Sequence, residues 1–291
     1  MSTAGRQLPG SDTRPHCYRH PDRETYISCQ RCTRPICPDC MTQAAVGFQC
    51  PECVREGAAQ TPAVRTSFGG RVTSSGSRVT MLLIAINVMV FLIANATGGL
   101  QGEFTRRLVL VSDAYAPRHI EGVAQGSYWQ LITSTFLHTQ LLHFAFNMIG
   151  IWIFGSYLES QLGRWRYAGL YLVSGLAGSV GVYWLSNPQV PSLGASGAVF
   201  GLFGASLLVL LKQRRDVSQL LMLLGINLVF TFVVPNVSWQ AHVGGLAAGL
   251  LMGAAFTYAP RSQRVVVHAA AVLGLAAVCL GLVWLRTLAL T

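Results

Sequence analysis

The stretch "SLGASGAVFG" (residues 192–201) places a serine among small residues at the edge of an apolar run. Ser196 is flanked by Gly194, Ala195 and Gly197, where no polar group is needed for solubility. A lone serine of this kind usually packs against a neighbouring helix of a membrane bundle. A chemical role for Ser196 therefore depends on which other polar side chains the chain brings to the same level.

The composition indicates a membrane protein with two unlike parts. Of 291 residues, 52% are hydrophobic and only 11% are charged, which is far from the balance of a soluble domain. Seven of the eight cysteines lie between Cys17 and Cys53, and every long apolar stretch begins after Thr80. We predict an all-α polytopic membrane protein with four parts: a small zinc-binding domain (1–56), a flexible Gly/Ser/Thr-rich linker (57–79), a six-helix core (80–258) and one further C-terminal helix (259–291).

Seven stretches after the linker are candidates for membrane-spanning helices. A bilayer core requires about 20 mostly apolar residues, with a usable range of roughly 17 to 25. The candidate spans are 80–97, 140–158, 166–186, 196–211, 217–234, 240–258 and 265–286. The only polar features of the last span, His268 and Cys279, are interpreted as structural.

The positions of the basic residues predict the orientation. The first 79 residues lack the apolar segment of a signal peptide, so the N-terminus is expected in the cytoplasm. Of the 21 basic residues, 17 then lie on the inner side, as the positive-inside rule requires, and the C-terminus lies outside. Because these residues are scattered and nearly all arginine, we expect the plasma membrane of a bacterium and no nucleic-acid partner.

Four polar residues fall in the first turns of the second, fourth and sixth spans. These spans run in the same direction, so their first turns share one outer level. The second span carries His143 and Asn147, four residues apart and on one face, while the fourth opens with Ser196 and the sixth with His242. Each alone is well explained by a hydrogen bond across the bundle. Four polar residues at one depth of the bilayer, where polar groups are costly, indicate a functional site.

These residue types suit hydrolysis of a peptide bond. Ser196 becomes a nucleophile when a base takes its proton, and His242 is the natural base because the unperturbed pKa of a histidine is about 6.5. The His143 ring, the Asn147 amide and the Ser196 backbone N–H are candidate donors to the oxyanion. No Asp or Glu occurs in these outer first turns, which predicts a Ser-His dyad rather than a triad.

Small residues recur every four positions in the two helices that would carry the dyad. Such stripes let helix backbones approach closely, which Ser196 and His242 need if they are to come within about 3 Å. The stripes comprise Gly197, Gly201 and Ala205 in one helix and Ala241, Gly245, Gly249 and Gly253 in the other.

Taken together, the motifs resemble the rhomboid family of intramembrane serine proteases. The matching elements are "HFAFN" (143–147), "GASGAVFG" (194–201) and "AHVGGLAAG" (241–249), with "GSYLESQLGRWRYAGLYLVSG" (155–175) between the first two. The resemblance implies Ser196 as nucleophile, His242 as general base, and His143 and Asn147 as oxyanion donors. It also implies cleavage of transmembrane substrates near their outer ends, with no cofactor for catalysis.

Two positions differ from the family pattern. The family usually has a tyrosine four residues after the nucleophile to stack on the catalytic histidine, and this chain has Phe200, which can stack but cannot donate a hydrogen bond. The long first loop of the family usually carries Trp-Arg, and here it reads Trp129-Gln130. Neither change removes a reacting group.

The N-terminal part contains four pairs of metal-ligand residues at a two-residue spacing. The pairs are Cys17 with His20, Cys29 with Cys32, Cys37 with Cys40, and Cys50 with Cys53. Each pair can clamp one edge of a tetrahedral zinc ion, so eight ligands predict two structural Zn²⁺ ions. Disulfides are the alternative, but thiols stay reduced in the cytosol, where we expect this domain.

The order and gaps of these ligands resemble a B-box-type zinc finger. That resemblance implies an interleaved pairing of the first pair with the third and of the second with the fourth, while sequential pairing remains open. A finger of this kind can dock a protein partner or recruit substrate. We expect transmembrane proteins and the lipid bilayer as partners of the core.

Two other functions compete with proteolysis. The first is a rhomboid-like protein that binds client transmembrane helices without cutting them, which the presence of both Ser196 and His242 disfavours. The second is a transporter with an unrelated zinc domain, which predicts two similar halves with broken helices. The chain shows no such internal symmetry.

Overall fold

A computed structural model describes residues 14–61, 65–70, 76–115, 120–234 and 237–291. The chain forms two compact units, Met1–Ala63 and Val64–Thr291. The first unit contains the cysteine array and the second contains the apolar helices, so the division follows the change in composition along the sequence.

The N-terminal unit is built around its cysteines rather than around aliphatic side chains. Strand β1 (His16–Cys17) pairs with β2 (His20–Glu24), β3 (Thr42–Gln43) pairs with β4 (Phe48–Gln49), and both pairs are antiparallel. Helix α1 (Pro51–Gln60) follows and is capped at its N-terminus by Cys50, whose Sγ accepts a hydrogen bond from the Cys53 N–H. Among residues 14–61, which the structure describes, the buried core holds one aliphatic side chain, Ile36, and six cysteines. Such a small core is typical of domains that depend on a metal for stability.

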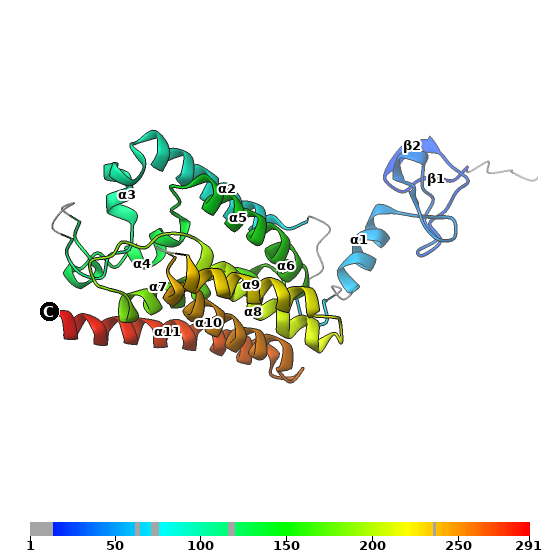
Figure 1. Cartoon of the computed structure of the whole chain (residues 1–291). Coiled ribbons are helices and arrows are strands. Elements are labelled where there is room, and N and C mark those ends of the chain that lie inside the picture. The colour runs from blue at the N-terminus through cyan, green and yellow to red at the C-terminus, as the bar shows by residue number, and fades with distance from the viewer. Residues whose placement is uncertain (1–13, 62–64, 71–75, 116–119, 235–236) are drawn as a thin grey trace, which may run out of the picture. The chain divides into compact units, whose positions relative to one another are not determined.

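The second unit is helical, as predicted (Figure 1). Its main helices in chain order are α2 (Arg78–Ala96), α5 (Leu141–Gly150), α6 (Ser156–Leu162), α7 (Arg164–Leu185), α8 (Ser196–Lys212), α9 (Ser218–Val233), α10 (Trp239–Tyr258) and α11 (Arg264–Leu290). A π-helical turn, η6 (Ile151–Gly155), joins α5 to α6, so these two form one continuous segment. The all-α fold class is therefore confirmed.

The number of full-length spans is smaller than the seven predicted. Within the described residues, five helices are long and apolar enough to cross a membrane, namely α2, the α5–α6 segment, α7, α10 and α11. Helices α8 and α9 have 17 and 16 residues. At 1.5 Å per residue each falls short of a hydrocarbon core of about 30 Å. Before α8 the chain runs without regular helix from Ser186 to Ala195.

The segment predicted as a linker is partly structured. Helix α1 continues past residue 56 to Gln60. Residues 65–70 form a turn whose Thr66 hydroxyl donates to the Gln161 carbonyl at 2.6 Å, and Phe68 is buried in the helical core. The prediction missed this contact because one phenylalanine in a Gly/Ser-rich run leaves no periodic pattern. Residues 62–64 and 71–75 of the predicted linker lie outside the described residues.

Helices α7, α8 and α10 pack tightly through their small residues. A Cβ atom on Gly245 of α10 would overlap the Gly197 carbonyl oxygen of α8, and one on Gly249 would overlap the Gly201 carbonyl. A Cβ atom on Gly178 of α7 would lie 2.9 Å from the Ala241 carbonyl oxygen. Backbones therefore meet directly, in the small-xxx-small mode that the sequence predicts.

A buried carboxylate joins the α5–α6 segment to the start of α2. Glu159 is 5% exposed, and its oxygens accept hydrogen bonds from the Val79 N–H at 3.0 Å and the Thr80 N–H and hydroxyl at 2.8 Å. The N–H groups of a first helical turn have no acceptor within the helix, so this carboxylate caps α2 from a neighbouring element.

The long loop before α5 is anchored by Trp129 and Gln130. The Trp129 indole N–H donates to the Arg107 carbonyl at 2.8 Å. The buried Gln130 amide accepts from the Val111 N–H at 3.2 Å and donates to the Glu121 carbonyl at 2.8 Å. Glutamine thus holds two loop backbone groups where the family pattern usually has arginine.

Candidate active site

The backbone before Ser196 is held by the loop that precedes α5. The Gly194 N–H donates to the Ser134 carbonyl at 2.9 Å, and the Ala195 N–H donates to Nε2 of His138 at 3.2 Å. Gly194 has a φ of 127°, and a Cβ atom there would collide with the His143 ring. Glycine is therefore required at this position both by the backbone and by the packing of His143.

Ser196 and His242 meet across the interface of α8 and α10. Ser196 is the first residue of α8, His242 is the fourth of α10, and Ser196 Oγ lies 2.8 Å from His242 Nε2. His242 is 8% exposed and Ser196 is half-buried. The distance is that of a hydrogen bond and suits transfer of a proton from serine to histidine.

Two further residues hold the imidazole of His242. The Phe200 ring stacks on it, with ring centroids 4.2 Å apart and planes at 10°. The Thr231 hydroxyl of α9 lies 2.5 Å from Nδ1. Phe200 therefore makes the stacking contact with histidine that a phenylalanine can make at this position. The contribution of Thr231 was not predicted, because a threonine in an apolar helix carries no motif.

The two predicted oxyanion residues lie on one face of α5. Asn147 is 4% exposed, and its amide donates to the His143 carbonyl at 2.8 Å; the second N–H of the amide has no acceptor among the described residues. The His143 ring packs against Gly194, two residues before Ser196. Ser196 begins α8, so its backbone N–H has no acceptor within the helix.

His138 is a residue near the site that sequence reasoning missed. It is fully buried, accepts the Ala195 N–H described above, and lies edge-on to His143 with ring centroids 5.3 Å apart. It therefore supports both the serine loop and an oxyanion candidate. The signal in the sequence is a second histidine five residues before His143, in a loop rather than on a helical face.

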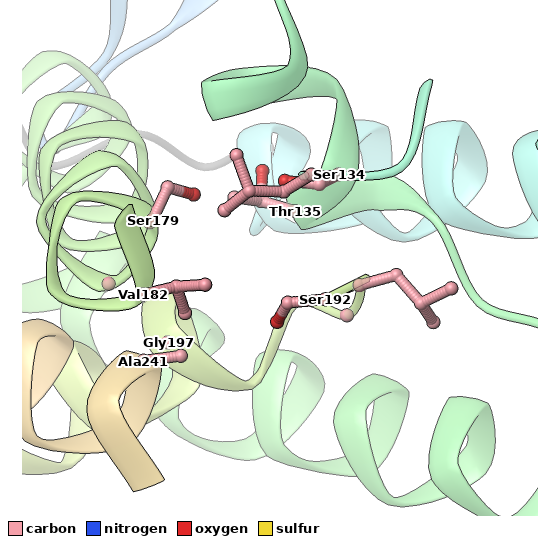
Figure 2. A pocket seen from close by; sticks show the side chains of 12 residues that line it. Ser134, Thr135, Ser179, Val182, Ser192, Gly197 and Ala241 are labelled. Carbon is pink, nitrogen blue, oxygen red and sulfur yellow. The ribbon is translucent and has the colours of Figure 1, made fainter. Parts of the chain in front are cut away.

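A small cavity lies next to α7, at the starts of α8 and α10. Figure 2 shows hydroxyl side chains of Ser134, Thr135, Ser179 and Ser192 around it, together with Gly197 and Ala241. Its volume is about 20 Å³, enough for about one water molecule. Gly197 and Ala241 are the chain neighbours of Ser196 and His242, so the cavity places hydroxyl groups close to the dyad.

The N-terminal ligand pairs converge into two tetrads. The first joins Cys17 and His20 with Cys37 and Cys40, and within it the candidate ligand atoms lie within 4.8 Å of one another. The second joins the other two pairs in the same way; its members are Cys29, Cys32, Cys50 and Cys53. The grouping is interleaved rather than sequential.

The thiols of these tetrads are chemically suited to a metal ion. Burial raises the pKa of Cys29, but N–H groups of Cys50, Arg31 and Cys32 donate hydrogen bonds to its sulfur and lower the pKa to about 6. All seven array cysteines are free thiols. Burial and neighbouring thiols instead raise the pKa of Cys40 to about 11. Cysteine sulfurs grouped four at a time match the closed tetrahedral sites that soft divalent metals prefer.

Comparison with known proteins agrees with this geometry. The Rhomboid domain model matches residues 125–259. The chain is 35% identical over 181 residues to rhomboid protease GluP of Bacillus subtilis (strain 168), which covers 60% of this chain and 34% of that protein.

Two other relatives extend the comparison. The chain is 36% identical to the rhomboid-family protein YdcA of the same organism, covering 45% of this chain and 68% of that one. RHOMBOID-like protein 5 of Arabidopsis thaliana is 38% identical over 45% of each chain. The chain thus spans about a third of the length of GluP and two thirds of that of YdcA. The region matched by the Rhomboid domain model contains every helix from α5 to α10, and the similarity to YdcA covers two thirds of that protein. The chain therefore belongs to the rhomboid family.

Proposed function

We propose that this protein is an intramembrane serine endopeptidase that cleaves transmembrane helices of other proteins. The observation that carries the proposal is the 2.8 Å contact between Ser196 Oγ and His242 Nε2. Two relatives, GluP and rhomboid-type serine protease 2 of Emericella nidulans, are named as proteases, which supports the same chemistry for this chain.

The first half of the reaction forms an acyl-enzyme. Ser196 Oγ attacks the substrate carbonyl carbon while its proton moves to His242 Nε2, and a tetrahedral oxyanion results. The carbon–nitrogen bond then breaks, and the proton on Nε2 passes to the leaving amine. The acyl group stays bonded to Ser196 Oγ.

The second half uses water. His242 Nε2 takes a proton from the attacking water, and the acyl carbon again becomes tetrahedral. Collapse releases the carboxylic acid product and returns the proton to Ser196 Oγ. A water-sized polar cavity beside Gly197 supports this step, since water must reach a site surrounded by apolar helices.

The oxyanion would be stabilised by groups from α5 and α8. The second N–H of the Asn147 amide, the His143 ring and the Ser196 backbone N–H are the candidate donors. Such donors act most strongly where bulk water is excluded, and removal of one typically costs about 10²–10³ in kcat.

We assign the protein to a bacterial plasma membrane, with a cytoplasmic N-terminus, an outer C-terminus and cleavage near the outer end of the substrate. The distribution of arginines supports this orientation. We further propose that the metal of each N-terminal tetrad is Zn²⁺, held by four protein ligands. A closed four-ligand site supplies folding stability and leaves no position for a reacting water. A protein partner for this domain is a further proposal.

The test is cleavage of a model transmembrane substrate in liposomes containing the full chain. We expect the wild type to cut, and Ser196→Ala and His242→Ala each to abolish cleavage. Ser206→Ala is the matched control, because Ser206 is also a serine of α8 and its buried hydroxyl has no partner among the described residues. A fluorophosphonate probe should label the wild type at Ser196 only. Binding of substrate without cleavage or labelling would instead support a non-catalytic binder of client helices.

A further inference from the structure

Helix α9 presents one polar residue to the site. Its buried residues are Leu220, Leu224 and Thr231, which share one stripe, and most of its other side chains are exposed. Of these three buried residues only Thr231 is polar, and the half-buried Asn227 lies one turn before it. The Thr231 hydroxyl contacts Nδ1 of His242, the ring nitrogen that does not face Ser196.

The hydrogen-bond partners of Thr231 decide which nitrogen of His242 carries the proton. A threonine hydroxyl has one proton to donate and lone pairs to accept. Its proton is directed to the Asn227 carbonyl oxygen at 2.8 Å, an atom that can only accept. Toward His242, Thr231 must then accept, which requires a proton on Nδ1 and leaves Nε2 free to take the Ser196 proton.

The opposite arrangement leaves a proton without an acceptor. If Nε2 carried the proton, it would donate to Ser196 Oγ, and the Ser196 hydroxyl proton would have no other partner among the described residues. If Thr231 donated to Nδ1, it would also give up its bond to Asn227. With the proton on Nδ1, each of three protons has an acceptor. Ser196 donates to Nε2, Nδ1 donates to the Thr231 hydroxyl, and Thr231 donates to the Asn227 carbonyl.

We propose that Thr231 is a positioning residue that holds His242 in the tautomer able to act as a base and stabilises its protonated form, as the third member of a Ser-His-Thr relay. This inference rests on the proposed proteolytic function. When His242 becomes an imidazolium, its Nδ1–H donates to Thr231 as a charge-assisted bond, which is stronger than the neutral bond of the resting site. The interaction therefore favours the transition state over the ground state and should act on kcat.

A neutral third member also suits the position. An acidic partner for His242 would place a charge at membrane depth, where it is expensive. A hydroxyl that already satisfies its own proton on the helix backbone adds an acceptor without a charge. This accounts for a dyad-like sequence with no Asp or Glu near His242.

The experiment compares Thr231→Val, Thr231→Ser and Thr257→Val in liposomes with a model transmembrane substrate, measuring kcat and KM in mole fraction. Thr257 is the matched control because it is equally buried and donates to the carbonyl four residues earlier at 2.7 Å, as Thr231 does. We expect Thr231→Val to lower kcat about 10- to 100-fold with KM unchanged, which is the range for a lost hydrogen bond to a charged group. Thr231→Ser should retain activity within a few-fold of wild type, and Thr257→Val should match wild type.

A second readout separates positioning from folding. The rate of fluorophosphonate labelling of Ser196 should fall with Thr231→Val in parallel with kcat, while the melting temperature should change no more than for Thr257→Val. The inference would be overturned if Thr231→Val and Thr257→Val had equal kcat. It would also be overturned if Thr231→Ser lost as much kcat as Thr231→Val. If Thr231→Val does not fold, the kcat of Thr231→Ala is compared with that of Thr231→Ser, and the same outcomes support or overturn the inference. A wild type that neither cuts nor is labelled would instead refute the proposed function itself.

Discussion

The Phe200 ring and the His242 imidazole lie parallel, with centroids 4.2 Å apart and an angle of 10° between their planes. Phe200 comes four residues after Ser196 in α8, so nucleophile and stacking ring lie on the same helical face. Ser196 contacts one edge of the imidazole, Thr231 the other, and Phe200 one face. The histidine is thereby restrained in position and in rotation.

The stacking predicts that Phe200→Ala lowers activity. Loss of the ring lets the imidazole tilt, and small misplacements of a base can cost up to about 100-fold. The measurement is kcat in liposomes, with Phe203→Ala as control. Phe203 is similarly buried in α8 and packs against Phe154 and Phe200, so its loss disturbs the packing but leaves in place the ring that stacks on His242. Phe200→Tyr should retain activity. Equal loss of kcat in the Phe200→Ala and Phe203→Ala proteins would mean that stacking serves packing alone.

The contact between α8 and α10 predicts a sharp penalty for a single methyl group. Gly249→Ala places a Cβ atom against the Gly201 carbonyl, and such overpacking typically costs about 1–3 kcal/mol. The melting temperature in detergent should fall accordingly. Gly274→Ala in α11 is the control, since a Cβ atom there meets nothing within 4 Å. A stable Gly249→Ala protein with unchanged activity would contradict this packing.

The buried cap on α2 predicts that Glu159→Gln is destabilising. Glutamine has one acceptor oxygen where the carboxylate has two, so the bonds from Val79 and Thr80 cannot all be kept. An unsatisfied buried donor costs about 1–3 kcal/mol. Glu103→Gln is the comparison, because Glu103 pairs with Arg106 and Arg107 at the surface and should cost less than about 1 kcal/mol. Chemical or thermal unfolding of both variants measures the difference.

The two tetrads predict a fixed metal content for the full chain. Elemental analysis of purified protein should return two zinc ions per chain. Cys29→Ser should remove one of them and Cys279→Ser none, because Cys279 is a buried thiol of α11 outside both tetrads. Prolonged chelation should unfold the N-terminal unit, since the ligands make up most of its core. Full metal content in the Cys29→Ser protein would refute the second tetrad.

Much of the fold follows from the sequence because its signals are local. Apolar runs of about 20 residues identify membrane helices, and the observed ends differ from the predicted ones by a few residues at most sites. The four-residue stripes of glycine and alanine predict the close approach of α8 and α10. Cysteine pairs at a fixed spacing predict metal sites. Each of these signals lies within one helix or one short loop.

The parts that were missed depend on single residues whose partners are distant in sequence. Phe68 is buried by helices that begin ten or more residues later, and a lone phenylalanine does not reveal this. His138 and Thr231 have ordinary neighbours in sequence, and their contacts to Ala195 and His242 arise only when the helices assemble.

The sequence by itself determined the all-α membrane class, the separate cysteine-rich unit and the candidate reacting pair, because residue type, periodicity and spacing carry that information. Only the tertiary structure decided the interleaved grouping of the metal ligands, the 2.8 Å approach of Ser196 to His242 and the placement of Thr231 on Nδ1. The physical reason is that hydrogen bonds and metal tetrads require positions correct to a few tenths of an ångström, and close packing of distant segments sets those positions.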